Sequence, residues 1–577
     1  MNPEHLRHSL AHLLAAAVLE LYPDTKRAIG PAIENGFYYD LELPKPISDE
    51  DLPKIEEKMR EILKTWTTFS HKEVSADEAR KIFKDNPYKL ELIDEFSEKG
   101  DKLTIYTSGS YDDLCRGGHV ENAKEIDPKA FKLTHLAGAY WRGSEKNKML
   151  TRIYGLAFAT PKELEDHVAM LEEAKKRDHK KLGPELDLFV FSELVGSGLP
   201  LWTPKGTLVR NLLDSFVWEL RKARGYVQVD IPHITKKDLY ETSGHWEKFK
   251  DELLKITTRE GHVFAMKPMN CPHHTQIYAR RPWSYRELPQ RYASTTKVYR
   301  DEQSGELAGL SRVRAITQDD AHVFCRHSQV KDEIFKVWDI ISEFYGAFGF
   351  ELSIRLSLHD PEHFEKYLGT PELWKNAEDK LRELVKERGV KATEAVGEAA
   401  LYGPKIDFLG KDAIGRLHQI ATIQLDMNLP DRFDLTCVNE KGEKERIVMI
   451  HCAIMGSIER FLSVAIEHFA GAFPVWLAPV QVAILPVSDK VNEYAGNVLK
   501  QLSNLGIRVE LHDQNESIGK KIRNAEMQKI PYLLVVGEKE AAAEGVAVRQ
   551  RGKGDLGVQK LGDFISQLEK EIKTKQL

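Results

Sequence analysis

The chain opens with a helical repeat of apolar residues. They recur every three or four positions, at Leu10, Leu13, Leu14, Ala17 and Leu21. This spacing is typical of an amphipathic helix whose apolar side packs on a core. Apolar and polar residues then alternate at 36–40 and 103–107, and alternation predicts half-buried strands. We therefore predict an α+β unit over residues 1–155.

A charged stretch separates this unit from the rest of the chain. Residues 160–181 carry many acidic and basic side chains and few apolar ones, which favours a solvated linker helix. We assign residues 156–183 to this linker. The longest block, residues 184–472, mixes long amphipathic helices with β-rich runs.

The C-terminal residues alternate between strand and helix patterns. Beyond a break at 471–479, the order is strand, helix, strand, helix and strand, at 480–487, 492–505, 509–511, 518–527 and 532–536. This order predicts a mostly parallel sheet with helices on its faces. Residues 473–577 are therefore expected to form an α/β domain.

Length and charge limit the class of protein. A chain of 577 residues exceeds the size of one hydrophobic core, so several domains are expected. The net charge of −6 excludes a polybasic protein, although local patches can still bind nucleic acid. With 42% hydrophobic and 30% charged residues, the chain is not a disordered one.

Three features favour the cytoplasm. The five cysteines are scattered and odd in number, which argues against a disulfide framework. The first residues lack the basic and apolar regions of a secretion signal. The most apolar stretch, 473–487, contains three prolines and cannot run as one membrane-spanning helix. We predict a cytoplasmic protein without a membrane partner.

Two pairs of metal-capable residues lie in the N-terminal unit. His8 and His12 are four apart on the first predicted helix, so both project from one face. Cys115 and His119 bracket a glycine-rich loop that can bring their side chains together. Such a set suits either a zinc site or a metal-free hydrolytic pocket. Spacing alone does not choose between them, and histidines at helical spacing are also common on surfaces.

Three segments of the central block carry further candidate chemistry. The first, 225–232, ends a long helix that begins near Thr207. The second runs from a strand at 298–302 through a loop rich in Gly and Ser to Arg312 and Arg314, and the third is 456–461. Arginines beside a flexible loop suit a triphosphate, because guanidinium groups pair with phosphate oxygens. A solvated hairpin has a similar composition.

In this order and at these separations, the three segments resemble the signature motifs of class II aminoacyl-tRNA synthetases. Pro232 corresponds to the end of motif 1, Arg300 and Glu302 to motif 2, and Arg460 to motif 3. The resemblance implies an antiparallel-sheet catalytic core at 184–472. It also implies that the N-terminal α+β unit is an editing domain and that the C-terminal α/β unit binds the anticodon.

Three further segments resemble the zinc-ligand segments of the threonyl-tRNA synthetase family. They lie at 266–272, 317–322 and 449–451, and they imply that Cys271, His322 and His451 hold one Zn²⁺ per subunit. A thiolate and two imidazoles are a sensible zinc set, and three protein ligands leave a position for substrate. The alternative is a buried thiol with satisfied core histidines. His273 and Cys452 are spare metal-capable groups beside this set.

The resemblance implies ATP-dependent ligation of L-threonine to tRNA(Thr) through a threonyl-adenylate, with hydrolytic editing of seryl-tRNA(Thr). It implies ATP with Mg²⁺, L-threonine, tRNA(Thr) and a second copy of the chain as partners, the homodimer forming through motif 1. The implied catalytic residues are Arg300, Glu302, Arg312, Lys405 and Arg460. The implied substrate-binding residues are Met269, Gln318, Asp320, Tyr402, Gln419, Thr422, Gln424 and Ser457.

The resemblance extends to both ends of the chain. The implied editing residues are His8, His12, Lys89, Tyr106, Asp113, Cys115 and His119, and the implied anticodon-binding residues are Asn515, Glu540 and Arg549. Ile316 departs from the pattern, because the family has an aromatic residue there to stack on adenine. The ubiquitin-like domain that often precedes the editing domain has no counterpart before residue 1, which implies a naturally short form or a shortened chain.

Serine and valine explain why such an enzyme needs two sites. A polar site strongly rejects valine, which lacks the hydroxyl, but serine differs from threonine by one methyl group, worth only about 1–3 kcal/mol. A zinc site therefore admits serine, and a second pocket must hydrolyse the product.

Three other functions remain open from the sequence. A prolyl-, glycyl- or histidyl-specific enzyme shares the core but lacks the Cys271, His322 and His451 set. A catalytically silent relative that binds RNA usually loses the motif arginines, which this chain keeps. A stand-alone metallohydrolase would use the N-terminal quartet and leave the central block unexplained.

Overall fold

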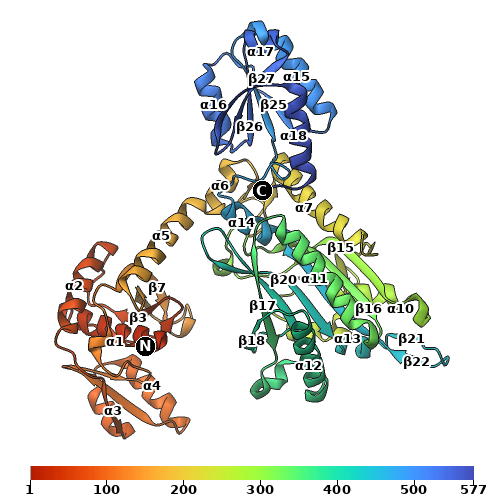
Figure 1. Cartoon of the computed structure of the whole chain (residues 1–577). Coiled ribbons are helices and arrows are strands. Elements are labelled where there is room, and N and C mark those ends of the chain that lie inside the picture. The colour runs from red at the N-terminus through yellow and green to blue at the C-terminus, as the bar shows by residue number, and fades with distance from the viewer. Residues whose placement is uncertain (1) are drawn as a thin grey trace. The chain divides into compact units, whose positions relative to one another are not determined.

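The computed structural model describes residues 2–577, and these form two compact units that divide at Glu172 and Glu173 (Figure 1). The predicted charged helix is confirmed as two helices, α5 (Pro161–Arg177) and α6 (His179–Glu185). Contacts divide the chain only within α5, so the limits predicted at 155, 183 and 472 stay predictions.

The smaller unit is built around helix α1 (Pro3–Leu21). The helix begins at Pro3 because the Asn2 side chain caps it, accepting a hydrogen bond from the N–H of Glu4, and because proline is favoured in the first turn. Its apolar side packs on α2 (Leu52–Leu63) and β3 (Gly36–Glu42). Leu10, Leu13 and Leu14, which the sequence pattern selects, are fully buried there.

Two antiparallel sheets complete the smaller unit, as the α+β prediction requires. The first has five strands, β1 (Lys26–Arg27), β2 (Ala32–Ile33), β3, β7 (Phe131–Tyr140) and β8 (Met149–Ala157). The second has three strands, β4 (Ser70–Val74), β5 (Leu103–Ser108) and β6 (Tyr111–Leu114). Helices α3 (Ala76–Ile82) and α4 (Pro87–Glu98) pack on β5.

The larger unit contains one eight-stranded sheet. Its order is β11 (Val227–Gln228), β15 (Gln290–Tyr299), β16 (Ala315–Cys325), β23 (Val448–Ser457), β20 (Leu417–Asp426), β19 (Lys405–Lys411), β17 (Glu351–Leu358) and β18 (Ala392–Val396). The two end strands pair in parallel with their neighbours, and every other pair is antiparallel. The antiparallel core that the resemblance implies is therefore confirmed.

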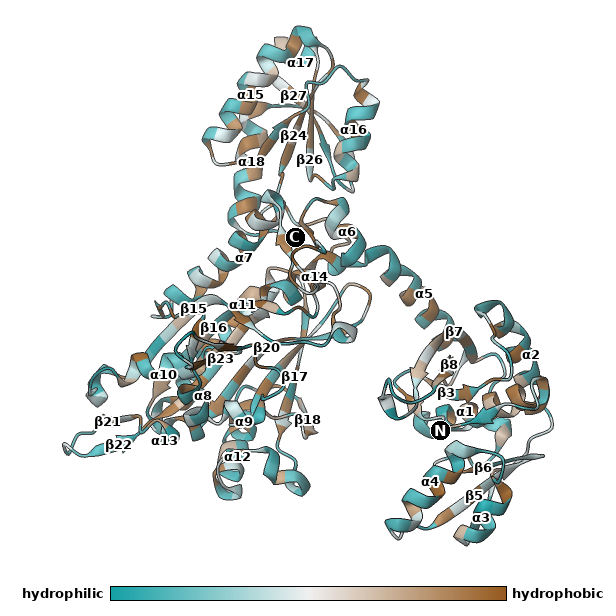
Figure 2. Cartoon of the chain, turned by 180° about the vertical axis from the view of Figure 1, so that it is seen from behind, coloured by the Kyte–Doolittle hydropathy of each residue, from teal (hydrophilic) through white to brown (hydrophobic). Residues whose placement is uncertain are grey.

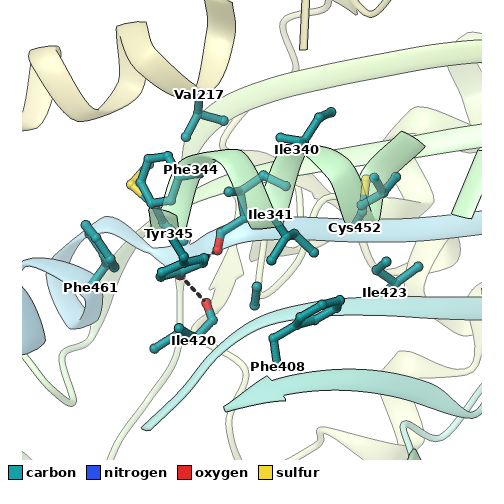
Figure 3. Packing of buried hydrophobic residues seen from close by; sticks show 14 of the residues in the cluster. Val217, Ile340, Ile341, Phe344, Tyr345, Phe408, Ile420, Ile423, Cys452 and Phe461 are labelled. Atoms are coloured by element: carbon teal, nitrogen blue, oxygen red, sulfur yellow. Dashed lines mark hydrogen bonds between the residues drawn. The ribbon is translucent and has the colours of Figure 1, made fainter. Parts of the chain in front are cut away.

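Three long helices cover one face of this sheet: α7 (Pro204–Lys222), α11 (Val330–Gly346) and α14 (Ile458–His468). Helix α11 lies over the sheet and packs on β23 and β20 (Figure 1). Phe344 of α11, Phe461 of α14 and Ile423 of β20 belong to one continuous apolar core between the helices and the sheet (Figure 3). Alternate strand residues face this core, which leaves the other set for the opposite face.

Shorter elements surround the sheet. The helices are α8 (Lys237–Ser243), α9 (His245–Lys248), α10 (Cys271–Ala279), α12 (Pro371–Glu387) and α13 (Asn428–Arg432). The small sheets are β9 (Phe189–Val190) with β10 (Leu201–Trp202), β12 (Ile234–Lys236) with β14 (Val263–Met266) and β13 (Lys255–Thr257), and β21 (Thr436–Val438) with β22 (Lys444–Arg446).

The C-terminal residues form a five-stranded sheet in the order β25 (Val509–Leu511), β24 (Val482–Pro486), β26 (Tyr532–Val536), β27 (Gly545–Gln550) and β28 (Gly554–Lys560). The first three are parallel, as predicted, and the last two are antiparallel. Helices accompany them, namely α15 (Asn492–Asn504), α16 (Ile518–Met527), α17 (Glu538–Ala542) and α18 (Leu561–Lys573). Figure 2 shows β24 and β26 as largely hydrophobic between these more hydrophilic helices.

None of the helices within residues 2–577 combines the length and the apolar character needed to cross a membrane.

Candidate functional site

Two adjoining cavities lie beside the eight-stranded sheet. Their volumes are about 700 and 620 Å³. Both are lined by Arg300, Gln318, Thr422 and Ala453, so the cavities share a wall. Cavities of this size suit small ligands of the size of an amino acid and a nucleotide.

The structure brings all sixteen residues predicted for the central site to these two cavities. The first cavity is lined by Met269, Cys271, Arg300, Gln318, Asp320, His322, Tyr402, Thr422, Gln424 and His451. The second adds Glu302, Arg312, Lys405, Gln419, Ser457 and Arg460. The roles assigned to these residues stay predictions.

Three elements converge on the proposed metal ligands. Cys271 begins α10, while His322 and His451 are direct cross-strand partners in β16 and β23. Nε2 of His322 lies 3.1 Å from Nδ1 of His451, and the ligand atoms of all three residues lie within 4.8 Å of one another. All three side chains are buried. The donor set and its convergence fit a zinc ion.

Further polar groups orient both imidazoles from behind. Nε2 of His451 lies 2.8 Å from a carboxylate oxygen of Asp426. Nδ1 of His322 lies 2.8 Å from Nδ1 of His274, whose Nε2 lies 3.2 Å from the hydroxyl of Ser294. Such partners fix the tautomer and the orientation of metal-binding histidines. Motif comparison did not identify these three residues, because their function is to hold other side chains.

Protonation at this cluster is set mainly by burial. Burial lowers the pKa of His322 well below its usual range, so its imidazole is neutral. Burial and the nearby carboxylates of Asp320 and Asp426 raise the pKa of Cys271. A metal cation held here would reverse the second effect, because the thiolate is the form of cysteine that binds metals.

The two spare metal-capable residues lie outside this cluster. His273 is buried on α10, and neither of its ring nitrogens has a hydrogen-bond partner. The sulfur of Cys452 lies 3.7 Å from the hydroxyl of Tyr226 and 3.5 Å from the carbonyl of Ala321. Neither residue belongs to a group of potential metal ligands among residues 2–577.

Hydrogen bonds connect the polar residues around the three ligands. The Asn270 amide donates to Asp320 at 3.0 Å and to Gln318 at 3.4 Å. The hydroxyl of Tyr402 donates to Gln424 at 2.6 Å, and its ring stacks on His451 with centroids 4.6 Å apart. These contacts fix hydrogen-bond donors and acceptors beside the three potential metal ligands, where they can bind a small polar molecule.

Sequence comparison did not identify His245, which is fully buried near this cavity. Its ring centroid lies 6.1 Å from that of Tyr402, and Ser243 hydrogen-bonds its Nδ1 at 2.7 Å. Its Nε2 has no partner, and burial lowers the pKa of the ring to about 3. The ring is therefore neutral near pH 7, but it is too weak a base to serve as an efficient general base there. Only the short motif Ser243-Gly244-His245 could have suggested it.

The second cavity is lined by positively charged side chains. The Arg312 guanidinium donates to Glu302 at 2.6 Å, and Lys405 pairs with Asp407 at 3.2 Å. Ser457 precedes α14, and its hydroxyl accepts the N–H of Arg460 at 3.1 Å. Arginines and a lysine facing one cavity suit a polyphosphate. Ile316 also lines this cavity, so its apolar side chain is available for contact with a base.

The N-terminal residues form a second polar cluster. The sulfur of Cys115 lies 3.5 Å from Nε2 of His8 and 3.4 Å from Nε2 of His119. The ring of His12 lies 5.0 Å from that of His8 and 4.4 Å from that of His119. Tyr106 completes the group, with its ring 4.9 Å from His119. The two predicted pairs therefore converge, as their spacing indicates.

A buried ion pair lies beside this cluster. Nζ of Lys89 lies 2.6 Å from Oδ1 of Asp113, and both side chains are almost completely buried. The hydroxyl of Tyr111, which the sequence did not reveal, donates to Asp113 at 2.9 Å. Burial raises the pKa of Asp113, but Lys89 and Arg27 together move it below its usual range. The carboxylate is therefore ionised, and its charge is balanced by two cations.

Burial keeps the N-terminal cluster neutral. It lowers the pKa of His12 to about 3 and that of His119 to about 2. It raises the pKa of Cys115 to about 11. A neutral imidazole beside a protonated thiol offers a nitrogen lone pair that can accept a hydrogen bond from a water molecule and so orient it. The ligand atoms of His8, His12, Cys115 and His119 are also close enough together to hold a metal ion.

The three predicted anticodon residues come from different elements of the C-terminal residues: a loop, α17 and β27. Asn515 is exposed between β25 and α16. Glu540 accepts the N–H of Gly537 at 2.9 Å, and Arg549 lies 3.6 Å from Asp555. No hydrogen bond or ion pair within residues 2–577 joins the three, so their common role stays a prediction.

Three family models match the chain. Residues 103–154 match the second additional domain of threonyl and alanyl tRNA synthetases. Residues 250–469 match the class II tRNA synthetase core domain of the G, H, P, S and T types. Residues 481–571 match an anticodon binding domain.

Curated relatives match over almost the whole chain. A threonine–tRNA ligase of Porphyromonas gingivalis is 51% identical over 572 residues, which cover 98% of this chain and 87% of the relative. A threonine–tRNA ligase of Cytophaga hutchinsonii is 50% identical over 576 residues, covering 99% and 88%.

Solved structures give the same result. The RNA binding domain of a threonyl-tRNA synthetase from Cryptosporidium parvum is 38% identical, with a TM-score of 0.65, and the match covers 68% of this chain and 98% of that one. A putative threonyl-tRNA synthetase from Aeropyrum pernix is 29% identical, with a TM-score of 0.61, and the match covers 69% and 97%.

Burial of Cys115 predicts slow alkylation. With a pKa of about 11, the thiol should react with iodoacetamide at pH 8 roughly 10²-fold more slowly in the native protein than in urea, because only the thiolate reacts. Mass spectrometry of the Cys115 peptide measures both rates, and the urea-unfolded protein is the control. Equal rates in the two states would contradict the protonation assigned to this cluster.

Proposed function

The chain belongs to the threonyl-tRNA synthetase family, and we propose that it ligates L-threonine to tRNA(Thr) and edits seryl-tRNA(Thr). The carboxylate of threonine attacks the α-phosphorus of ATP, which forms threonyl-adenylate and releases pyrophosphate. A hydroxyl of the 3′-terminal ribose then attacks the threonyl carbonyl, and AMP leaves. The observation that carries the proposal is the cluster of Cys271, His322 and His451 on the wall of the first cavity. Arg300 lines this cavity too, and Arg460 lines the adjoining one.

Cys271, His322 and His451 would hold Zn²⁺ in the first cavity. When bound, the ion supplies a Lewis acid that takes the amino and hydroxyl groups of threonine. Asp320 is suited to accept the hydroxyl proton, because its carboxylate lines the cavity and is held by Asn270. Gln318 and Gln424 provide further polar contacts. Valine would leave these buried polar groups unpaired, which explains its rejection.

Arg300 and Arg460 neutralise phosphate charge in this proposal. Arg300 lines both cavities and is suited to hold the α-phosphate between the two substrates. Arg460 lines the second cavity only and would bind the γ-phosphate. Positioning and charge neutralisation account for most catalysis of this type. Mg²⁺ enters with ATP as part of the substrate.

The N-terminal cluster would hydrolyse the ester of seryl-tRNA(Thr). Its histidines orient a water molecule and take its proton as the water oxygen attacks the seryl carbonyl. That proton then passes to the ribose oxygen, which leaves as a hydroxyl. His8 and His119 both contact Cys115 and are the best-placed bases. Lys89 is already paired with Asp113, so we assign it to fixing the pocket wall rather than to binding water.

A homodimer is proposed through the motif 1 region. Strand β11 lies at one edge of the eight-stranded sheet, and Val227 within it is 52% exposed. An exposed edge with apolar side chains is suited to pair with another chain. Binding of the tRNA anticodon by Asn515, Glu540 and Arg549, and a cytoplasmic location, stay predictions.

Pyrophosphate exchange tests the synthetic reaction. The chain should exchange pyrophosphate with threonine, weakly with serine and not with valine, and it should contain one zinc per chain. Cys271→Ala should lose the zinc and lower exchange by at least about 10²-fold, since even residues behind a metal ligand act on that scale. Cys437→Ala is a matched control, because Cys437 is also a buried thiol of this unit. Full exchange without metal would defeat the zinc account.

Deacylation tests the second site. His8→Ala combined with His119→Ala should leave threonylation intact and lower seryl-tRNA(Thr) hydrolysis by about 10²–10⁴-fold, the usual contribution of a general base. His135→Ala is the control, since this exposed histidine lies in the same unit and outside the cluster. Unchanged hydrolysis in the double variant would rule out editing at this pocket.

A further inference from the structure

A buried ion pair lies on the helix-covered side of the sheet, directly behind the cavities. Arg221 of α7 and Asp319 of β16 are 2% and 0% exposed. The Arg221 guanidinium lies 3.2 Å from the Asp319 carboxylate and donates to the Asp319 carbonyl at 2.9 Å. It also lies 3.4 Å from the carbonyl of Cys452 in β23. Neither side chain lines either of the two cavities of the candidate site, and the reaction described above uses neither.

Asp319 lies opposite an irregularity in β23. The pairs on either side are Gln318 with Ser457 and Asp320 with Ala453. Three residues of β23, 454–456, therefore face one residue of β16. Such a bulge leaves backbone N–H groups without their partners in the sheet.

The Asp319 carboxylate satisfies two of these N–H groups. One oxygen accepts the N–H of Ile454 at 2.9 Å, and the other accepts that of Met455 at 3.0 Å. From α11, the Tyr345 hydroxyl lies 2.8 Å from the carbonyl of Ile454 and 3.0 Å from that of Ile420 (Figure 3). The bulge is therefore held by side chains from two neighbouring elements.

The shape of this bulge determines the positions of residues on the cavity side of the sheet. Gln318 and Asp320 flank Asp319 in β16, and both line the first cavity. Ser457 ends the bulge and caps α14 through the N–H of Arg460, and both of these line the second cavity. A change in the backbone at Asp319 would therefore move residues of both cavities.

Arg221 keeps Asp319 ionised, because burying a carboxylate without a cation beside it costs free energy. Burial raises the pKa of Asp319 to about 6, and the Arg221 charge and the two bulge N–H groups oppose that rise. An unpaired buried carboxylate takes up a proton or moves toward water. In either case it no longer offers two acceptor oxygens to the bulge.

We propose that Arg221 and Asp319 are positioning residues, which hold the bulge of β23 and so align the threonine-binding and ATP-binding residues. The proposal rests on the proposed function for the identity of these substrates. Through Arg221, it also makes the long helix α7 part of the support of the active site.

The experiment compares Asp319→Asn, Arg221→Met, Arg221→Lys and the double variant Arg221→Met with Asp319→Asn. The matched control is Arg291→Met, because Arg291 forms a similar ion pair with buried Glu333, at 2.8 Å, and lines neither cavity. Each full-length protein is measured by thermal unfolding, by threonine-dependent pyrophosphate exchange, and by calorimetric binding of ATP.

We expect Arg221→Met and Arg291→Met both to lower the unfolding midpoint. Only the Arg221 and Asp319 variants should lose about 10²-fold in kcat/KM for exchange. A loss of this size is typical when active-site groups are displaced by about 1 Å. Arg221→Lys should keep part of the activity, because it keeps the charge. The double variant should regain stability, since no charge is left unpaired, yet remain slow, because an amide offers the bulge only one acceptor.

Two results would overturn the proposal. One is exchange by Asp319→Asn or the double variant within about twofold of the parent chain, and the other is activity that follows the unfolding midpoint through all variants, Arg291→Met included. If the parent chain shows no exchange with threonine, the proposed function fails. ATP binding then decides the inference separately, since at least a tenfold weaker affinity in Asp319→Asn, but not in Arg291→Met, is still expected.

Discussion

The pairing of β16 with β23 is the constraint on which the larger unit depends. It places His322 directly opposite His451, so the two imidazoles lie on one face with ring nitrogens 3.1 Å apart. A slip by one residue would turn one ring toward the helix-covered face and separate the pair. The same pairing sets Gln318 opposite Ser457, and thereby joins the first cavity to the second.

Two clusters in this chain use the same residue types in different electrostatic surroundings. Behind the central cluster, the Asp426 carboxylate contacts His451, and Asp320 lies at the cavity wall, so negative charge surrounds the three donors. Beside the N-terminal cluster, Lys89 and Arg27 balance the buried carboxylate of Asp113. A divalent cation is therefore favoured at the central cluster, whereas the N-terminal pocket suits uncharged hydrolytic chemistry.

Much of this organisation could be predicted from the sequence, because it follows from the periodic spacing of side chains in strands and helices and from short sequence motifs. The period of two in β16 puts Ile316, Gln318 and Asp320 on one face, and the spacing of His8 and His12 puts both on one side of α1. Residues that act through long-range contacts could not be predicted in this way. His274 behind His322 and Arg221 beside Asp319 carry no local pattern, because each partner is distant in the sequence.

X-ray absorption at the zinc edge of the purified chain, with and without threonine, tests the central claim most directly. The account predicts one sulfur neighbour at about 2.3 Å and imidazole nitrogens at about 2.0 Å, with additional light-atom neighbours when threonine is added. A spectrum with no sulfur neighbour, or one that threonine leaves unchanged, would contradict the claim that this ion selects the amino acid.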